Sequence, residues 1–170
     1  MKYQIIYADP PWRYEHPPIG ASNRSIENHY PTMTIDEIKS LPIPADDNAV
    51  LFLWATAPKL KECIDVMLAW GFQYRTCMVW DKDIIGMGYW FRNQYELLLV
   101  GLRGKFSPPI PSDRPSSVWR ERRTKHSKKP DGIRDWIGRC FPLATKLELF
   151  ARQKTDGWDV FGNEVDGIQL

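Results

Sequence analysis

Metal-binding and disulfide-forming residues are scarce in this chain. Its 170 residues include three cysteines and three histidines. Cys63, Cys77 and Cys140 stand far apart among apolar residues, and no histidine lies at a ligand-like spacing from them. Such a pattern is typical of reduced core cysteines and argues against a disulfide framework or a metal site. We therefore expect a cytoplasmic protein without a bound metal.

Long apolar runs are missing as well. A membrane-spanning helix needs about 20 consecutive apolar residues, and no segment approaches this length. The apolar run near the N-terminus is broken by Asp9 and two prolines, which does not fit a signal peptide. A hydrophobic fraction of 43% is ordinary for a globular protein, and the length suits one domain. We expect a single domain over residues 1–170 and no contact with a membrane.

Positive charge is concentrated in one segment. The formal net charge is only +2, yet residues 101–130 contain nine Lys and Arg and two acidic residues. Its prolines and serines predict that the segment at about 104–129 is a basic loop. Basic blocks favour a phosphate backbone as partner, so we interpret Arg120, Arg122 and Arg123 as phosphate contacts. The alternatives are a solvated charged loop and an interface with an acidic partner.

The most informative motif is Asp9-Pro10-Pro11-Trp12, directly after the apolar run Ile5–Ala8. The run is typical of a buried strand, which the prolines end abruptly. In open α/β sheets, ligands bind at the carboxyl ends of the strands. The motif is therefore predicted to lie in a ligand site.

This motif suits the exocyclic amine of a nucleobase, whose lone pair is delocalised into the ring. Asp9 and the Pro10 carbonyl are two acceptors for the two amine N–H groups, and pairing both favours a nitrogen with a free lone pair. Because prolines fix φ and donate no ladder bond, the Pro10 carbonyl is expected to point into the site. Trp12 is expected to stack on the base, a contact worth about 1–3 kcal/mol. The alternative is a strand-ending turn with a core tryptophan.

Strands and helices alternate along the rest of the chain. Capping and breaker residues predict helices at about 34–41, at about 58–71 and from 130 onward. The second helix is expected to bury Leu60, Ile64, Met67 and Leu68. Apolar runs predict strands at 49–54, 75–81, 96–102, 146–152 and 158–165. The order predicts an α/β fold with a mostly parallel central sheet flanked by helices.

Six short motifs follow one another along the chain. They are Asp9-Pro10-Pro11-Trp12, Tyr30-Pro31-Thr32-Met33, Leu51-Phe52-Leu53-Trp54, Lys129-Pro130-Asp131, Glu148-Leu149-Phe150-Ala151-Arg152 and Gly162-Asn163-Glu164. In this order they resemble the MT-A70 family of S-adenosylmethionine-dependent adenine N6-methyltransferases, which act on RNA or DNA. The resemblance implies a Rossmann-like methyltransferase fold in a permuted order, with the catalytic strand first.

The resemblance also implies roles for individual residues. The catalytic residues that hold the amine and base are Asp9, Pro10, Pro11 and Trp12. The cofactor, S-adenosyl-L-methionine, is expected at Asp9, Lys129, Phe150, Arg152, Asn163 and Glu164. Substrate-binding residues are Tyr30 in a gating loop, Glu96 beside the base pocket, and Arg120, Arg122 and Arg123. Glu164 departs from the Gln that is usual in eukaryotic catalytic members of the family.

The expected function is methylation of the N6 amine of adenine in nucleic acid. DNA is favoured over RNA because the compact members of the family that resemble this chain occur in bacteria and phages. The alternatives are RNA adenine methylation, N4-cytosine methylation, and a catalytically silent nucleic-acid-binding partner. The chain has no room for a separate target-recognition domain. Target selection is therefore expected to fall to the basic loop, to residues 13–31, or to a partner, either a second copy or another subunit.

Overall fold

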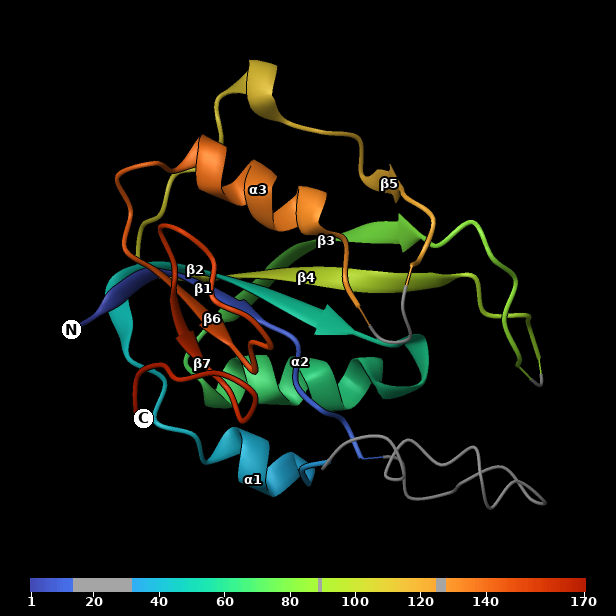
Figure 1. Cartoon of the computed structure of the whole chain (residues 1–170), viewed down its shortest axis with the longest axis horizontal. Helices are drawn as coiled ribbons and strands as arrows, with labels where there is room; N and C mark the ends of the chain where they lie inside the picture. Colours follow the sequence, from blue (N-terminus) through green and yellow to red (C-terminus); the bar gives the residue numbers. More distant parts are fainter. Residues whose placement is uncertain (14–31, 89, 125–127) are drawn as a thin grey trace.

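A seven-stranded sheet forms the centre of the molecule (Figure 1). The structure is a computed structural model, and it describes residues 1–13, 32–88, 90–124 and 128–170. The strand order across the sheet is β5-β3-β4-β2-β1-β6-β7. The strands are β1 Tyr3–Ala8, β2 Ala45–Ala55, β3 Gln73–Asp81, β4 Tyr95–Arg103, β5 Val118–Arg120, β6 Lys146–Leu149 and β7 Asp159–Phe161.

Strand direction confirms a mostly parallel sheet. Strand β1 lies between β2 and β6 and is parallel to both, and β6–β7 and β3–β5 are also parallel pairs. Only β4 runs against its neighbours, pairing antiparallel with β2 and β3. As a result, the first residues of β4 lie at the same edge of the sheet as the carboxyl ends of the other strands. This edge carries Asp9 after β1 and Glu96 near the start of β4.

Helices cover both faces of the sheet. Helices α1 (Ile35–Lys39) and α2 (Leu60–Ala69) lie on one face, and α3 (Asp131–Cys140) lies on the other (Figure 1). The predicted capping box is present, because the Thr34 hydroxyl accepts from the Glu37 N–H and the Glu37 carboxylate accepts from the Thr34 N–H. Short 3₁₀ turns occupy Ala57–Lys59 and Pro111–Asp113. The α/β layering is that of a Rossmann-like fold.

Two apolar cores fill the spaces between these layers. One packs α1 and α2 against Ile6, Leu51 and Leu53, and the other packs Ile133 and Ile137 of α3 against the opposite face. Alternate residues of β1 thus enter different cores, as expected for a strand covered on both faces. The prediction for α2 is wrong in part. Leu68 is 46% exposed, and the buried residues are Cys63, Val66 and Met67.

The basic segment is more structured than expected. Residues 104–129 are predicted to be a loop, but Val118–Arg120 form β5, which pairs in parallel with the end of β3. A strand of three residues carries too little periodicity to be recognised in the sequence. The pairing anchors the basic residues that follow β5 at the edge where β3 ends. Two other strands are shorter than predicted, since β6 ends at Leu149 and β7 at Phe161.

Within the described residues, no group of three or more His, Cys, Asp or Glu side chains is arranged to hold a metal ion. All three cysteines are free thiols, and only Cys63 is fully buried. No helix in those same ranges is long and apolar enough to cross a membrane.

Candidate functional site

The site begins where β1 ends. Pro10 and Pro11 form a tight turn after Asp9, in which the Trp12 N–H donates to the Pro10 carbonyl at 2.9 Å. The Pro11 carbonyl accepts from the Met33 N–H, also at 2.9 Å. The Pro10 carbonyl, which is predicted to point into the site, thus already accepts one hydrogen bond within the turn. The second lone pair of this oxygen is the only one available to another donor.

Trp12 is part of the core. Its side chain is 6% exposed, and the indole Nε1–H donates to the Trp54 carbonyl at 3.3 Å. Trp12 is thus a core residue, as the alternative interpretation of the motif predicted. Stacking of this ring on a base remains a prediction.

A chain of ion pairs, which we call the ionic cluster, joins four charged side chains: Asp9, Lys129, Glu96 and Lys82. Lys129 Nζ lies 2.9 Å from Asp9 Oδ1 and 3.1 Å from Glu96 Oε2. Lys82 Nζ lies 3.4 Å from Glu96 Oε1. Lys129 also lies 5.6 Å from the centre of the Trp54 ring. Asp9 and Lys129 are 120 residues apart in the sequence, and Glu96 reaches them because β4 begins at this edge of the sheet.

Burial changes the acid–base behaviour of this cluster. Burial raises the pKa of the Asp9 carboxyl, and the nearby Lys129 ammonium opposes that shift. Burial by itself lowers the pKa of Lys129, but Asp9 and Glu96 outweigh this effect and hold it above its ordinary value. Lys129 therefore stays charged. The ion pair with Lys129 favours the charged form of Asp9, and a carboxylate accepts hydrogen bonds strongly.

A cleft of about 500 Å³, open to solvent, lies beside Asp9. It runs between the end of β1, the end of β6 and the first turn of α3. Its wall is lined by Tyr7, Asp9, Lys128, Lys129, Pro130, Asp131, Arg134, Glu148, Phe150, Arg152 and Gln153. Four of the six predicted cofactor residues are among them: Asp9, Lys129, Phe150 and Arg152. Carboxylates and cations alternate along this wall.

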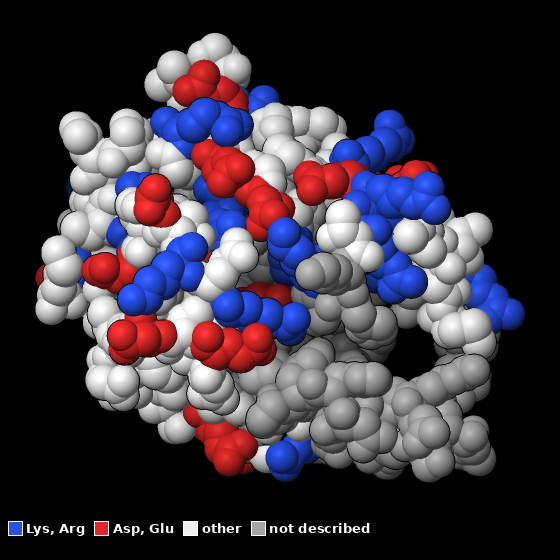
Figure 2. Space-filling model, in the orientation of Figure 1, with Lys and Arg blue, Asp and Glu red and all other residues white. Residues whose placement is uncertain are grey.

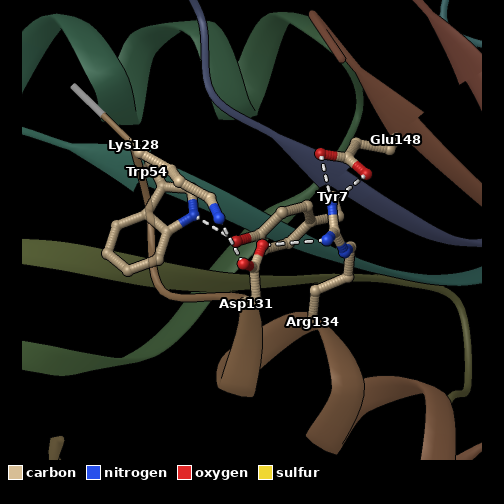
Figure 3. Close-up of polar contacts among 6 residues, drawn as sticks. All are labelled: Tyr7, Trp54, Lys128, Asp131, Arg134 and Glu148. Carbon is tan, nitrogen blue, oxygen red and sulfur yellow. Dashed lines mark hydrogen bonds and ion pairs between the residues drawn. The ribbon is translucent and has the colours of Figure 1, made fainter. Parts of the chain in front are cut away.

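The sequence interpretation missed Arg134, which holds the floor of this cleft together (Figure 3). This side chain is 10% exposed, and it bridges the Glu148 carboxylate at 3.1 Å and Asp131 Oδ1 at 3.0 Å. Lys128 pairs with Asp131 in turn. One signal was present, because Arg134 stands between Ile133 and Ile137 on the inward side of α3. Among the described residues, its buried Nε finds no hydrogen-bond partner, so one donor of the network is unused there.

Tyr7 and Glu148 lie under the same part of the cleft. Trp54 Nε1 donates to the Tyr7 hydroxyl oxygen at 2.7 Å. Burial raises the pKa of Tyr7, so the phenol remains protonated. Burial also raises the pKa of Glu148, although the Arg134 guanidinium opposes this.

The C-terminal cofactor residues lie around the ends of β6 and β7. Phe150 has φ of +62°, a left-handed conformation that ends β6 and turns the chain across the mouth of the cleft. Arg152 Nε lies 3.8 Å from Glu164 Oε1. Asn163 and Glu164 are exposed, and they lie at the same edge because β7 is parallel to β6. Their contact with a cofactor remains a prediction.

The predicted phosphate contacts lie outside the cleft. Arg120 is the last residue of β5 and is 80% exposed, and Arg122 and Arg123 are exposed as well. Figure 2 shows Lys and Arg gathered on the side of the molecule that carries β5, whereas acidic and basic groups are mixed elsewhere on this face. Tyr30 and most of residues 13–31 lie outside the described residues.

Known proteins that resemble this chain are methyltransferases. The sequence profile of the MT-A70 family matches residues 3–164. Type II methyltransferase M.MunI from Mycoplasma sp is 35% identical over 182 residues, covering 96% of this chain and 78% of that protein. Human N(6)-adenosine-methyltransferase catalytic subunit METTL3 is 33% identical over 186 residues, which is 99% of this chain but 29% of METTL3. The N(6)-adenosine-methyltransferase MT-A70-like protein of Drosophila melanogaster is 32% identical, and the chain spans 28% of its length.

The Rossmann-like sheet, the acidic turn at its carboxyl edge and these relatives define the class of the protein. It is an enzyme of the methyltransferase class, as the sequence predicted. The chain belongs to the MT-A70 family.

Proposed function

We propose that this enzyme transfers a methyl group from S-adenosyl-L-methionine to the N6 amine of adenine in nucleic acid, with DNA as the favoured substrate. The observation that carries this proposal is the position of two carboxylates, Asp9 and Glu96, on either side of Lys129 at the open edge of the sheet. An adenine amine needs hydrogen-bond acceptors rather than a strong base. The two carboxylates and the remaining Pro10 lone pair supply them.

Asp9 acts first by orienting the amine. Its carboxylate accepts one amine N–H, and pairing of the second N–H by the Pro10 carbonyl directs the nitrogen lone pair away from the ring. The amine proton becomes acidic only when the nitrogen carries the methyl group. Asp9, whose pKa is raised by burial, is then suited to receive it. The rest of the rate enhancement comes from alignment of the amine nitrogen with the methyl group and from exclusion of water from the site.

The cleft beside Asp9 has the charges that the cofactor requires. S-adenosyl-L-methionine supplies a methyl group on a sulfonium, and it also carries an amino group and a carboxylate. The wall of the cleft offers Glu148 and Asp131 to positive groups. It offers Lys129 and Arg152 to the carboxylate. Asn163 and Glu164, at the adjoining strand end, are the proposed ribose contacts.

The choice of DNA rests on the similarity to M.MunI, which is 35% identical to this chain. The chain spans most of M.MunI, a bacterial Type II methyltransferase, but less than a third of the longer relatives. RNA is the second candidate, because those longer relatives are named for adenosine, a ribonucleoside.

Mass spectrometry of nucleosides tests the proposal. The protein is incubated with cofactor and with DNA or RNA oligonucleotides, single- and double-stranded, which are then digested. N6-methyladenine in the DNA digest is the expected result. N6-methyladenine in RNA alone would establish the second candidate, and N4-methylcytosine would overturn the assignment to adenine. No methylated base from any substrate, while the cofactor binds, would identify a catalytically silent binding protein.

A further inference from the structure

The connection between β3 and β4, residues 82–94, carries the most exposed apolar side chains near the site. Trp90 is 92% exposed and Phe91 is 83% exposed, and Met87 and Ile85 follow at 75% and 70%. In Figure 1 this connection extends outward beyond the carboxyl edge of the sheet. Exposed aromatic residues grouped on one projecting segment usually mark a binding surface. We call the described residues of this connection, 82–88 and 90–94, the aromatic hairpin.

The hairpin has an ordered backbone that presents these side chains. The Lys82 N–H donates to the Gln94 carbonyl at 2.9 Å, and the Gly86 N–H donates to the Asn93 carbonyl at 2.8 Å. A Cβ atom at Gly88 would lie 2.0 Å from the Phe91 carbonyl oxygen, so only glycine permits this close approach. These contacts define the backbone on both sides of Trp90 and Phe91 within the described part of the hairpin.

A positively charged strip lies against the base of the hairpin. The Glu121 N–H donates to the Asp81 carbonyl at 3.2 Å, and the Arg123 N–H donates to the Lys82 carbonyl at 3.1 Å. These bonds attach the segment that carries Arg120, Arg122 and Arg123, which we call the arginine strip. The strip that carries the guanidinium groups is therefore joined to the base of the segment that carries the exposed aromatic side chains.

The same base is joined to the catalytic turn by the ionic cluster. Lys82, the first hairpin residue, pairs with Glu96, and Lys129 connects Glu96 to Asp9. The hairpin thus extends from the same edge of the sheet at which Asp9 lies.

We propose that the aromatic hairpin is a base-stacking surface, on which Trp90 and Phe91 stack against unpaired bases next to the methylated adenine while the arginine strip holds their phosphates. This inference rests on the proposed function. Stacking on aromatic rings accepts any base, and arginines beside the rings bind the backbone. A second copy of the chain fits this surface poorly. A two-fold contact uses the same patch on both copies, so it would bring two arginine strips into one interface.

Oligonucleotide binding by the full chain, with S-adenosylhomocysteine present, tests the inference. The probe is a fluorescein-labelled DNA strand with one methylated adenine, and anisotropy is measured over a series of salt concentrations. Trp90→Ala and Phe91→Ala are each expected to weaken binding roughly tenfold. The slope of log K against log salt should not change, because no charge is removed. Leu143→Ala is the matched control, since Leu143 is 97% exposed in the turn before β6.

An abasic nucleotide beside the target adenine gives a second measurement. It should weaken binding of the wild-type chain, yet add little to the loss in Trp90→Ala, because both changes remove the same contact. Wild-type affinity in both variants, with methylation by the wild-type chain intact, would overturn the stacking surface and leave the proposed function standing. Loss of a dimer in sedimentation, with affinity for DNA unchanged, would also overturn it. A wild-type chain that neither binds nor methylates any oligonucleotide would overturn the proposed function itself.

Discussion

Charged groups behave differently in the cleft and on the hairpin side of the molecule. In the cleft, the side chains of Lys129 and Arg134 are only 12% and 10% exposed, and each is held by two carboxylates. On the hairpin side, the side chain of Arg120 is 80% exposed and approaches one carboxylate, that of Asp81, at 3.7 Å. Both regions lie at the same edge of one sheet. They differ in how far ion pairs within the protein neutralise the charged side chains.

This difference separates two tasks. Buried and compensated charges have fixed positions, which alignment of a methyl group with a nitrogen requires. Exposed charges are free to exchange solvent ions for phosphates, which binding of a polymer requires. Mutations should therefore affect chemistry and folding in the cleft, and affinity and salt dependence on the hairpin side.

The largest effect is expected at Asp9. Asp9→Ala removes the acceptor that orients the amine, so methylation should fall by a factor on the order of 100 or more. Cofactor binding, measured by calorimetry, should persist, because the other cofactor residues on the cleft wall, Lys129, Phe150 and Arg152, are unchanged. Asp135→Ala, at an exposed position of α3, is the control and should remain active. Unchanged methylation in Asp9→Ala would show that the amine binds elsewhere.

A large loss of stability is expected when Arg134 is replaced. Arg134→Met leaves Glu148 buried without its partner, which should lower the free energy of unfolding by about 3–5 kcal/mol. Urea denaturation measures this, with Arg139→Met on the exposed side of the same helix as control. The double variant Arg134→Met/Glu148→Leu should regain much of the loss, because no lone charge remains. A double variant as unstable as the single one would contradict this account.

A smaller effect is expected on the pH dependence of methylation. Because burial raises the pKa of Asp9, activity should decline, as pH falls, at a higher pH than for an ordinary aspartate. Lys129 opposes that shift, so Lys129→Met should move the decline to still higher pH. Carbon-13 NMR titration of the Asp9 carboxyl, assigned with Asp9→Asn, checks the direction independently of activity. A decline that moves to lower pH in Lys129→Met would contradict the ion-pair assignment.

The smallest effects are expected on the arginine strip. Arg122→Ala and Arg123→Ala should leave the urea midpoint unchanged, since both side chains are exposed. Each should reduce the slope of log K against log salt by about 1 for an oligonucleotide. Arg139→Ala, away from the strip, should keep the wild-type slope. Equal slopes in all three variants would remove the strip from the nucleic-acid interface.

Local patterns predicted much of the architecture. The capping box at Thr34, the apolar run that forms β1 and the helix that begins after Pro130 are all present. These features depend on residues close together in the sequence, so the sequence alone is enough to predict them. The errors concern contacts made at a distance. Leu68 is exposed because α2 turns Cys63 and Val66 toward the sheet, and Val118–Arg120 become a strand only because β3 is beside them.

The candidate site likewise has features that the local sequence predicts and contacts that only the folded structure shows. The motif at Asp9 identifies where β1 ends and what chemistry its carboxylate suits, because a strand stop and an acceptor are local properties. Only the tertiary structure shows that the turn uses a Pro10 lone pair, or that Arg134 is buried beneath the cleft.

The sequence by itself determined the fold class, the family resemblance and the acceptor at the end of the first strand, since these depend on short patterns. The tertiary structure decided which charges meet. Lys129, Glu96 and Asp9 are far apart in the chain, and they form one cluster because an antiparallel β4 brings its first residues to the catalytic edge. Strand direction in the folded sheet, which no local pattern encodes, sets that arrangement.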